Sequence, residues 1–200
     1  MEYNGYLKVI KIKIVDIGFV KQNIEKLLSA IDRKRIERAE CFLQEEDKLL
    51  SLGAGYLISK NLSADKILYN ENGKPYLKDG PYFNLSHSGE YAVLAIDESR
   101  EVGIDIQSIK EKSETAIKYT SKEDLPLNDM FRLWSNKESL IKCLGANISL
   151  IKDVPGMPLE GERCYKGDYF YTKSTVFDGY SLSVTLKGKE PFDFIIEKEL

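Results

Sequence analysis

The sequence has little of several residue types, and each shortage argues against a class of site. Its 200 residues contain one histidine, His87, and three cysteines, Cys41, Cys143 and Cys164, with no CxxC spacing. A zinc site built from histidine and cysteine ligands is therefore not expected. The odd number of widely separated cysteines predicts free, buried thiols in a reducing compartment. Any metal here should be a hard cation held by carboxylates.

Long hydrophobic runs and an excess of one charge are also missing. The longest apolar run, from Tyr91 to Ile96, has six residues, whereas a membrane-spanning helix needs about 20. The 29 basic and 32 acidic residues leave a formal net charge of −3, so no global basic field predicts nucleic-acid binding. The N-terminus has no signal-peptide core. We expect a cytoplasmic protein with neither a membrane nor a nucleic-acid partner.

The chain mixes strand and helix patterns. Ile10, Ile12 and Ile14 alternate with lysines, which predicts a strand with one buried face. Helices are expected at 24–31, 45–62, 115–119 and 128–144, and strands at 82–85, 91–96, 102–107, 163–172 and 179–186. The elements interleave without the regular βαβ order of a parallel sheet. This favours an α+β protein with two similar-sized halves that meet near residue 100.

The lone histidine lies in the stretch FNLSHSGEYAVLAI, residues 83–96, which we interpret as a turn leading into an apolar strand. His87 stands between Ser86 and Ser88, with Asn84 and Gly89 nearby. A histidine between two serines offers one cation that titrates near neutrality and two hydroxyl donors in a compact segment. This pattern predicts an anion contact and not a core residue.

Two motifs carry the candidate carboxylates. In VGIDIQ (102–107), Asp105 and Gln107 share one strand face, so Asp105 is either a hard-cation ligand or a strand-end residue that reaches solvent or caps a loop. In LWSNKESLIKCLG (133–145), Glu138 and Lys142 are four residues apart and are either a surface ion pair or part of a site. Lys137 falls inside the apolar stripe of that helix, where a lysine is uncommon unless an anion faces it.

Two basic features complete the pattern. The run DRKRIER (32–38) and the turn GKP (73–75) are each explained on their own by a solvated helix end and an ordinary turn. Together with the histidine and two carboxylates they suit a polyphosphate ligand, because basic groups bind phosphate oxygens and carboxylates hold the Mg²⁺ that bridges them. No GxxxxGK[ST] segment is present, so a P-loop is excluded as the phosphate cradle.

The order of GKP, FNLSHS, VGIDIQ and LWSNKESLIK resembles the 4′-phosphopantetheinyl transferases of the surfactin-synthetase-activating type, over about residues 33–145. The resemblance implies a pseudo-dimeric α+β fold with two similar halves, 1–100 and 101–200, the second carrying the metal-binding motifs. It implies Mg²⁺-dependent transfer of 4′-phosphopantetheine from coenzyme A to a serine hydroxyl of an apo carrier protein (acyl, polyketide or peptidyl). Adenosine 3′,5′-bisphosphate would be released, and a monomer would contain the whole cleft.

The resemblance also assigns roles at matching positions. Asp105 and Glu138 match the Mg²⁺ carboxylates, Lys142 matches a pyrophosphate contact, and Glu138 is also a candidate to take the serine proton. Gln107 replaces a glutamate of many members and is expected beside the metal, hydrogen-bonded to its water. The implied coenzyme contacts are Lys74 and Pro75 beside the adenine, Ser86 and His87 at phosphate, and Arg35 and Arg38 at the 3′-phosphate.

Two further functions stay open at this stage. The chain could be a non-catalytic coenzyme A or nucleotide-binding module of the same fold, for which Gln107 is the only indication. It could also be a Mg²⁺-dependent pyrophosphate hydrolase.

The sequence also departs from the family at one basic position. That position is occupied by Leu50 here, and Lys48 is close enough to substitute. The motifs do not specify the carrier or the acceptance of acyl-coenzyme A, and the last 55 residues carry no motif.

Overall fold

The computed structural model describes residues 7–62, 67–110, 125–155 and 158–199. These residues form two four-stranded sheets, with strand orders β10-β1-β5-β4 and β6-β9-β8-β7, and a small β2-β3 hairpin. The strands of the first sheet are β1 (Lys8–Asp16), β4 (Tyr82–Ser88), β5 (Tyr91–Asp97) and β10 (Phe192–Lys198). Those of the second are β6 (Val102–Ser108), β7 (Glu160–Tyr165), β8 (Asp168–Phe177) and β9 (Tyr180–Lys187), and the hairpin pairs β2 (Ile67–Tyr69) with β3 (Pro75–Leu77).

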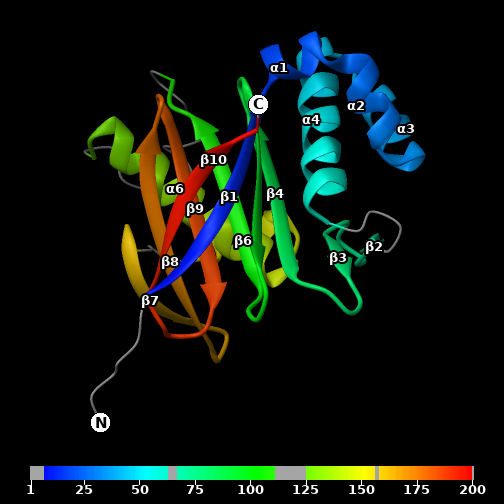
Figure 1. Cartoon of the computed structure of the whole chain (residues 1–200). Helices are drawn as coiled ribbons and strands as arrows, with labels where there is room; N and C mark the ends of the chain where they lie inside the picture. Colours follow the sequence, from blue (N-terminus) through cyan, green and yellow to red (C-terminus); the bar gives the residue numbers. More distant parts are fainter. Residues whose placement is uncertain (1–6, 63–66, 111–124, 156–157, 200) are drawn as a thin grey trace.

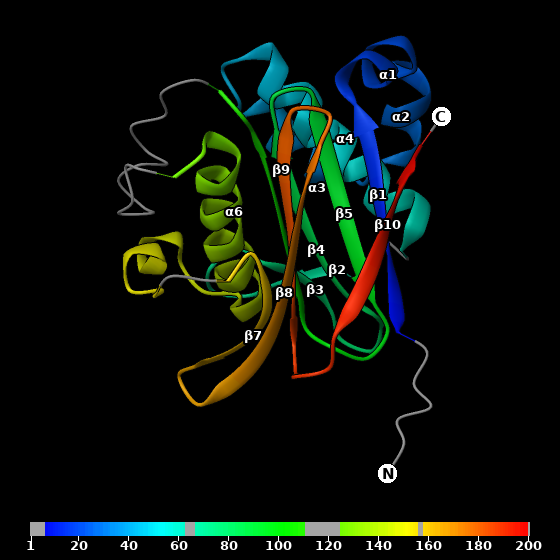
Figure 2. The same cartoon turned by 90° about the vertical axis from the view of Figure 1, so that its left-hand side faces the viewer.

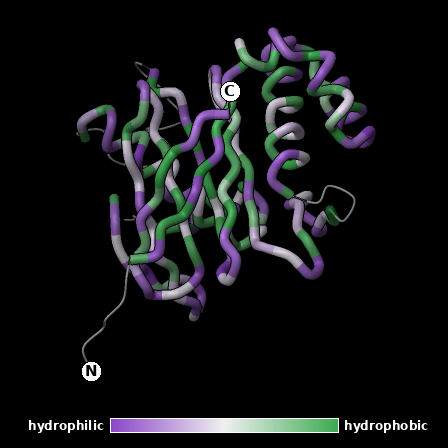
Figure 3. Tube along the Cα trace, in the orientation of Figure 1, coloured by the Kyte–Doolittle hydropathy of each residue, from purple (hydrophilic) through white to green (hydrophobic). Residues whose placement is uncertain are grey.

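Helices flank each sheet, and the sheets share a core. The helices α1 (Ile17–Gln22), α2 (Ile24–Ala30), α3 (Arg33–Glu40) and α4 (Glu45–Asn61) lie beside the first sheet, whereas α6 (Leu127–Leu144), followed by the 3₁₀ helix η2 (Ile148–Lys152), lies against the second (Figures 1 and 2). Isoleucines of β1 pack with those of β6 and with the apolar residues of β9. Figure 3 shows hydrophobic stretches along these central strands.

Local patterns predicted about half of these elements. Ile10, Ile12 and Ile14 are at most 2 % exposed, as the alternation requires, and α4 and α6 begin and end within one residue of the expected bounds. The single strand expected at 163–172 is wrong, because the chain reverses between β7 and β8. Lys166 and Gly167, with φ of 52° and 89°, make this two-residue turn. The helix expected at 115–119 lies outside the described residues.

The last strand, β10, was not expected. It pairs in parallel with β1, so residues from both ends of the sequence lie side by side in the first sheet. The mixed α+β class is confirmed, and the division near residue 100 stays a prediction. No helix in the described part of the chain is long and apolar enough to cross a membrane.

The cysteine prediction is partly wrong. All three cysteines are free and Cys143 is buried, but Cys41 and Cys164 are exposed. Cys164 lies on β7, at the edge of the second sheet, where only one neighbouring strand covers it.

Candidate active site

The two sheets meet along β4 and β6 through side chains. Alternate residues of β4 point at the edge of β6, which belongs to the other sheet. The oxygens of Asn84, Ser86 and Ser88 accept hydrogen bonds of 3.0, 3.3 and 3.0 Å from the backbone N–H groups of Ile104, Ile106 and Ser108. The polar residues of FNLSHS therefore satisfy a sheet edge that would otherwise leave buried donors unpaired.

His87 lies within strand β4, so its placement in a turn is wrong. The turn comes two residues later at Gly89, whose φ is 57°. Because neighbouring strand residues point to opposite faces, His87 faces away from the β6 side and is exposed. Partial desolvation by the surrounding protein, and then the charge of Lys142, lower the pKa of His87. The charge of Arg38 also lowers this pKa, whereas those of Asp47 and Asp105 raise it.

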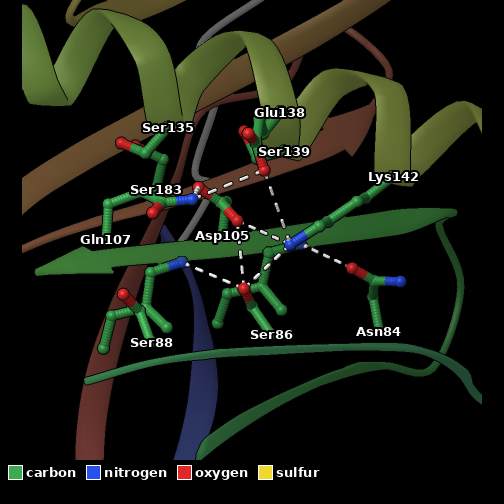
Figure 4. Close-up of polar contacts among 12 residues, drawn as sticks. Asn84, Ser86, Ser88, Asp105, Gln107, Ser135, Glu138, Ser139, Lys142 and Ser183 are labelled. Atoms are coloured by element: carbon green, nitrogen blue, oxygen red, sulfur yellow. Dashed lines mark hydrogen bonds and ion pairs between the residues drawn. The ribbon is translucent and has the colours of Figure 1, made fainter. Parts of the chain in front are cut away.

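Asp105 is the centre of the polar cluster and is fully buried. Its Oδ1 lies 2.5 Å from Lys142 Nζ and accepts a 3.0 Å hydrogen bond from Ser86 Oγ, and its Oδ2 accepts one of 3.1 Å from Gln107 Nε2 (Figure 4). The alternative of a strand-end aspartate reaching solvent is therefore wrong. A carboxylate held on a strand by three donors has a fixed orientation.

Helix α6 supplies the second carboxylate. Trp134, Glu138 and Lys142 are spaced by four residues and so share one helix face. Trp134 Nε1 donates a 2.7 Å hydrogen bond to Glu138 Oε1, and Glu138 Oε2 lies 3.5 Å from Gln107 Nε2 and 4.0 Å from Lys142 Nζ. The side chains of Glu138 and Lys142 are only 14 % and 26 % exposed, so they are part of the cluster and not a surface ion pair.

The cluster contains two carboxyl groups and one ammonium group. Burial and the nearby Asp105 carboxylate raise the pKa of Glu138 to about 8, while Lys142 and Trp134 act in the opposite direction. Two facing carboxylates that share one ammonium are a donor set of hard oxygens, which suits Mg²⁺. The described residues contain no group of three or more acidic, histidine or cysteine side chains that could hold a metal. Within the part of the chain that the structure describes, the candidate ligands are these two carboxylates, with Gln107 beside both.

Lys74 does not reach outward as a side chain that meets a ligand would. Its Nζ donates a hydrogen bond of 2.8 Å to the carbonyl oxygen of Cys143, at the C-terminal end of α6, and one of 3.2 Å to that of Val102, at the start of β6. Burial lowers the pKa of Lys74. The helix end attracts this cation because its last carbonyls lack partners within the helix. Sequence reasoning missed this contact, which joins residues 69 positions apart.

A cavity of about 330 Å³ opens beside this turn. Its lining includes Asn70, Lys74, Pro75, Tyr76, Glu101 and Leu144. The cavity therefore adjoins the end of α6 that carries Lys142.

The basic run forms α3, with Arg35 partly buried and Arg38 exposed. Both lie near Tyr69: the Arg38 guanidinium is 6.0 Å from its ring centroid, and Tyr69 influences the pKa of Arg35, which burial lowers. Arg35 Nε is buried and has no hydrogen-bond partner within the described residues. Leu50 is 4 % exposed and belongs to the core, so it cannot offer a contact to a ligand, whereas Lys48 is partly exposed.

Comparison with known proteins identifies the family of this chain. No family model matches the chain. The 4′-phosphopantetheinyl transferase Sfp of Bacillus subtilis (strain 168) is 35 % identical over 160 residues, covering 70 % of this chain and 71 % of that protein. A second 4′-phosphopantetheinyl transferase of Bacillus subtilis is 31 % identical over 153 residues, covering 64 % and 66 %. The transferase gsp of Aneurinibacillus migulanus is 30 % identical over 138 residues, covering 60 % and 58 %. The chain belongs to the 4′-phosphopantetheinyl transferase family of enzymes.

Proposed function

We propose that this protein transfers the 4′-phosphopantetheine group of coenzyme A to a serine hydroxyl of an apo carrier protein, releasing adenosine 3′,5′-bisphosphate. The observation that carries the proposal is the buried cluster of Asp105, Glu138 and Lys142 at the junction of the two sheets, in a chain of this family. Such a transfer needs positioning and charge neutralisation more than a covalent nucleophile. Acyl, polyketide and peptidyl carriers all present a suitable serine.

Mg²⁺ fits the donor set that the cluster offers. Asp105 and Glu138 would hold it, and Gln107, whose amide already lies beside both carboxylates, would hydrogen-bond its water. When bound, the ion neutralises the pyrophosphate oxygens.

The protein's own groups would do the rest of the work. Lys142 brings an ammonium to the same side of the cluster, where it would contact the pyrophosphate. Glu138, whose pKa burial and Asp105 raise to about 8, would accept the proton of the attacking serine hydroxyl when it is ionised. Ser86 holds Asp105 and Lys142 together, within 3.0 and 2.8 Å of its Oγ, so its role toward phosphate would be largely indirect.

The coenzyme contacts follow from the cavity and the basic side chains. Pro75 and the backbone of Lys74 would adjoin the adenine in the cavity beside α6, while the Lys74 ammonium anchors the helix end. His87, exposed and close to the charge of Arg38, would contact phosphate, and Arg35 with Arg38 would bind the 3′-phosphate as charge-assisted donors.

We also propose the pseudo-dimeric arrangement, with halves 1–100 and 101–200. In support, each half contributes most of one four-stranded sheet and a helical layer beside it, and the cluster draws residues from both. Because one chain supplies both sides of this site, a monomer is the expected form, and we propose that it acts in the cytoplasm.

The test is to incubate the protein with coenzyme A, Mg²⁺ and an apo carrier and to weigh the carrier. We expect the mass to rise by one phosphopantetheine arm, with Asp105→Ala and Glu138→Ala nearly inactive and Gln107→Ala impaired about 10–100-fold. If Gln107→Ala is as inactive as Asp105→Ala, the amide is a direct ligand. Coenzyme binding without transfer would indicate the non-catalytic module, and pyrophosphate cleavage without a carrier would indicate a hydrolase.

A further inference from the structure

The sheet face beneath α6 is polar although it is buried. Across the β6–β9 pair, Gly103 lies opposite Thr185, Asp105 opposite Ser183, and Gln107 opposite Ser181. These residues share one face because side chains alternate along a strand. The row of β6 that carries the Asp105 carboxylate thus lies next to a row of hydroxyls on β9. The buried hydroxyl array comprises Ser135, Ser139, Thr172, Ser181, Ser183 and Thr185, all 0 % exposed.

One part of the array is a chain of hydroxyls that ends on the helix backbone. Ser139 Oγ donates to the carbonyl oxygen of Asn136 at 2.9 Å. Because a hydroxyl has a single hydrogen, Ser139 must then accept from Thr185 at 2.7 Å, and Thr185 must accept from Thr172 at 2.8 Å. One direction of donation satisfies all three hydroxyls and connects β8 and β9 to α6.

The other part of the array ends at Ser135, one turn earlier on α6. Its Oγ donates to the Arg132 carbonyl at 3.2 Å and lies 2.6 Å from both Ser181 Oγ and Ser183 Oγ, from which it accepts. Ser135 and Ser139 stand on either side of Glu138 in the sequence, and Figure 4 shows them beside the carboxylate cluster. The two hydroxyl contacts therefore hold the turn of α6 that carries Glu138.

Gly103 sets how close the helix comes to the sheet. A Cβ at this position would lie 2.0 Å from the carbonyl oxygen of Ser139 and 2.3 Å from the backbone nitrogen of Cys143. The α6 backbone thus touches β6 two residues before Asp105. Without this approach, Lys142 would not reach Asp105 at 2.5 Å.

The chemistry of the array favours positioning over bulk stabilisation. A buried hydroxyl must be hydrogen-bonded to avoid a desolvation penalty, and each bond contributes only about 0.5–1.5 kcal/mol net. An apolar face would stabilise the contact at least as well, but it is non-directional. Hydroxyl pairs act at a fixed distance and angle, so they define where along the strands the helix lies.

We propose that the buried hydroxyl array is a positioning device that fixes α6 along β6 and β9 and thereby holds Glu138 and Lys142 against Asp105. This inference rests on the proposed function. The residues of the array do not touch the substrate, and they act through the side chains of the cluster.

The test compares two substitutions at one position. Thr185→Val keeps the shape and removes the hydroxyl, whereas Thr185→Ser keeps the hydroxyl. Thr175→Val, on the other face of β8, is the matched control. We expect Thr185→Val to raise the Mg²⁺ concentration for half-maximal transfer about 10-fold and to reduce the Mg²⁺-induced rise in Tm without substrates. Thr185→Ser should restore both values toward the parent, and Thr175→Val should change neither.

Each outcome decides between positioning and packing. If Thr185→Val lowers Tm but leaves both Mg²⁺ measurements at parental values, the array is merely structural and the proposal is wrong. The same holds if Thr185→Ser is as impaired as Thr185→Val. Should Thr185→Val fail to fold, Ser139→Ala interrupts the same hydroxyl chain and is held to the same criteria. A parent that never transfers would overturn the proposed function, and the Mg²⁺-induced Tm shifts would still decide the positioning role.

Discussion

Replacing Gly103 by alanine perturbs the contact between α6 and the sheet at a defined point. The new Cβ would lie 2.0 Å from the Ser139 carbonyl oxygen, and separations below 3.0 Å essentially never occur. Backbone atoms on both sides cannot rotate away, so α6 must move by about 1 Å or more. A shift of that size away from β6 carries Lys142 from its 2.5 Å contact with Asp105 toward the limit of a hydrogen bond.

Two magnitudes follow for Gly103→Ala. Overpacking of this kind costs about 1–3 kcal/mol of unfolding free energy, which lowers Tm by about 2–12 °C for a chain of this size. Misplacing reactive groups by about 1 Å reduces the rate about 100-fold, so the transfer rate should fall far more than stability accounts for. Rates are measured by mass spectrometry of the carrier, well below the Tm of the variant.

Gly53→Ala is the matched control for this prediction. Gly53 is also a buried glycine where a helix meets a sheet, but its Cβ would meet side-chain methyl groups of Val15 and Val20 at 3.1 and 3.2 Å, which yield more easily than backbone. We expect Gly53→Ala to keep nearly parental transfer. If Gly103→Ala keeps its Tm and more than half of its rate, the close approach of α6 does not position the cluster and the reasoning is refuted.

Three further predictions concern charge. The double substitution Arg35→Ala and Arg38→Ala should raise the KM for coenzyme A and leave the KM for 3′-dephospho-coenzyme A nearly unchanged. An equal rise for both substrates would show that α3 is only a solvated helix end. His87→Ala should raise the KM for coenzyme A several-fold, since a charge-assisted hydrogen bond contributes about 1.5–3 kcal/mol. A bound phosphate would raise the pKa of His87, which is lowered in the free protein. The affinity for coenzyme A should therefore be strongest at low pH. The difference in KM between the parent and His87→Ala should shrink as pH rises through the raised pKa. The pKa of Glu138 is about 8 in the folded protein against an ordinary value of 4.5, so protonated Glu138 favours the folded state. Without Mg²⁺, Tm should therefore fall as pH rises from 5 to 9, by an amount that corresponds to about 1.4 kcal/mol of unfolding free energy per pKa unit. A slope that persists in Glu138→Gln would contradict this.

The candidate site was predictable where residue type and order carry the chemistry. Asp105, Glu138 and Lys142 were named from two short motifs, and the structure brings all three together. Their roles toward Mg²⁺ and pyrophosphate stay predictions. Lys137 was expected to face the interior, and it is 7 % exposed.

For other named residues the contacts within the chain could not be predicted, because a partner from a distant segment decides them, and their roles toward the coenzyme stay predictions. Lys74 binds the end of α6, and Ser86 binds the edge of β6 together with Asp105 and Lys142. Nothing in the GKP or FNLSHS motif specifies these partners. The one readable signal was the alternation of polar residues through 84, 86 and 88, which is typical of a strand whose polar face meets a partner.

The sequence by itself determined the elements and the chemical groups. Helices α4 and α6 and strand β1 follow from periodicity in short segments, because buried positions repeat every 3.6 residues in a helix and every 2 in a strand. The order of the motifs identified the family. Only the tertiary structure decided which elements touch. The pairing of β10 with β1, the contact of Gly103 with α6 and the buried hydroxyl array join segments that are tens of residues or more apart. Such contacts depend on the shapes and hydrogen-bonding groups of two surfaces at once, and no single stretch of the chain records both.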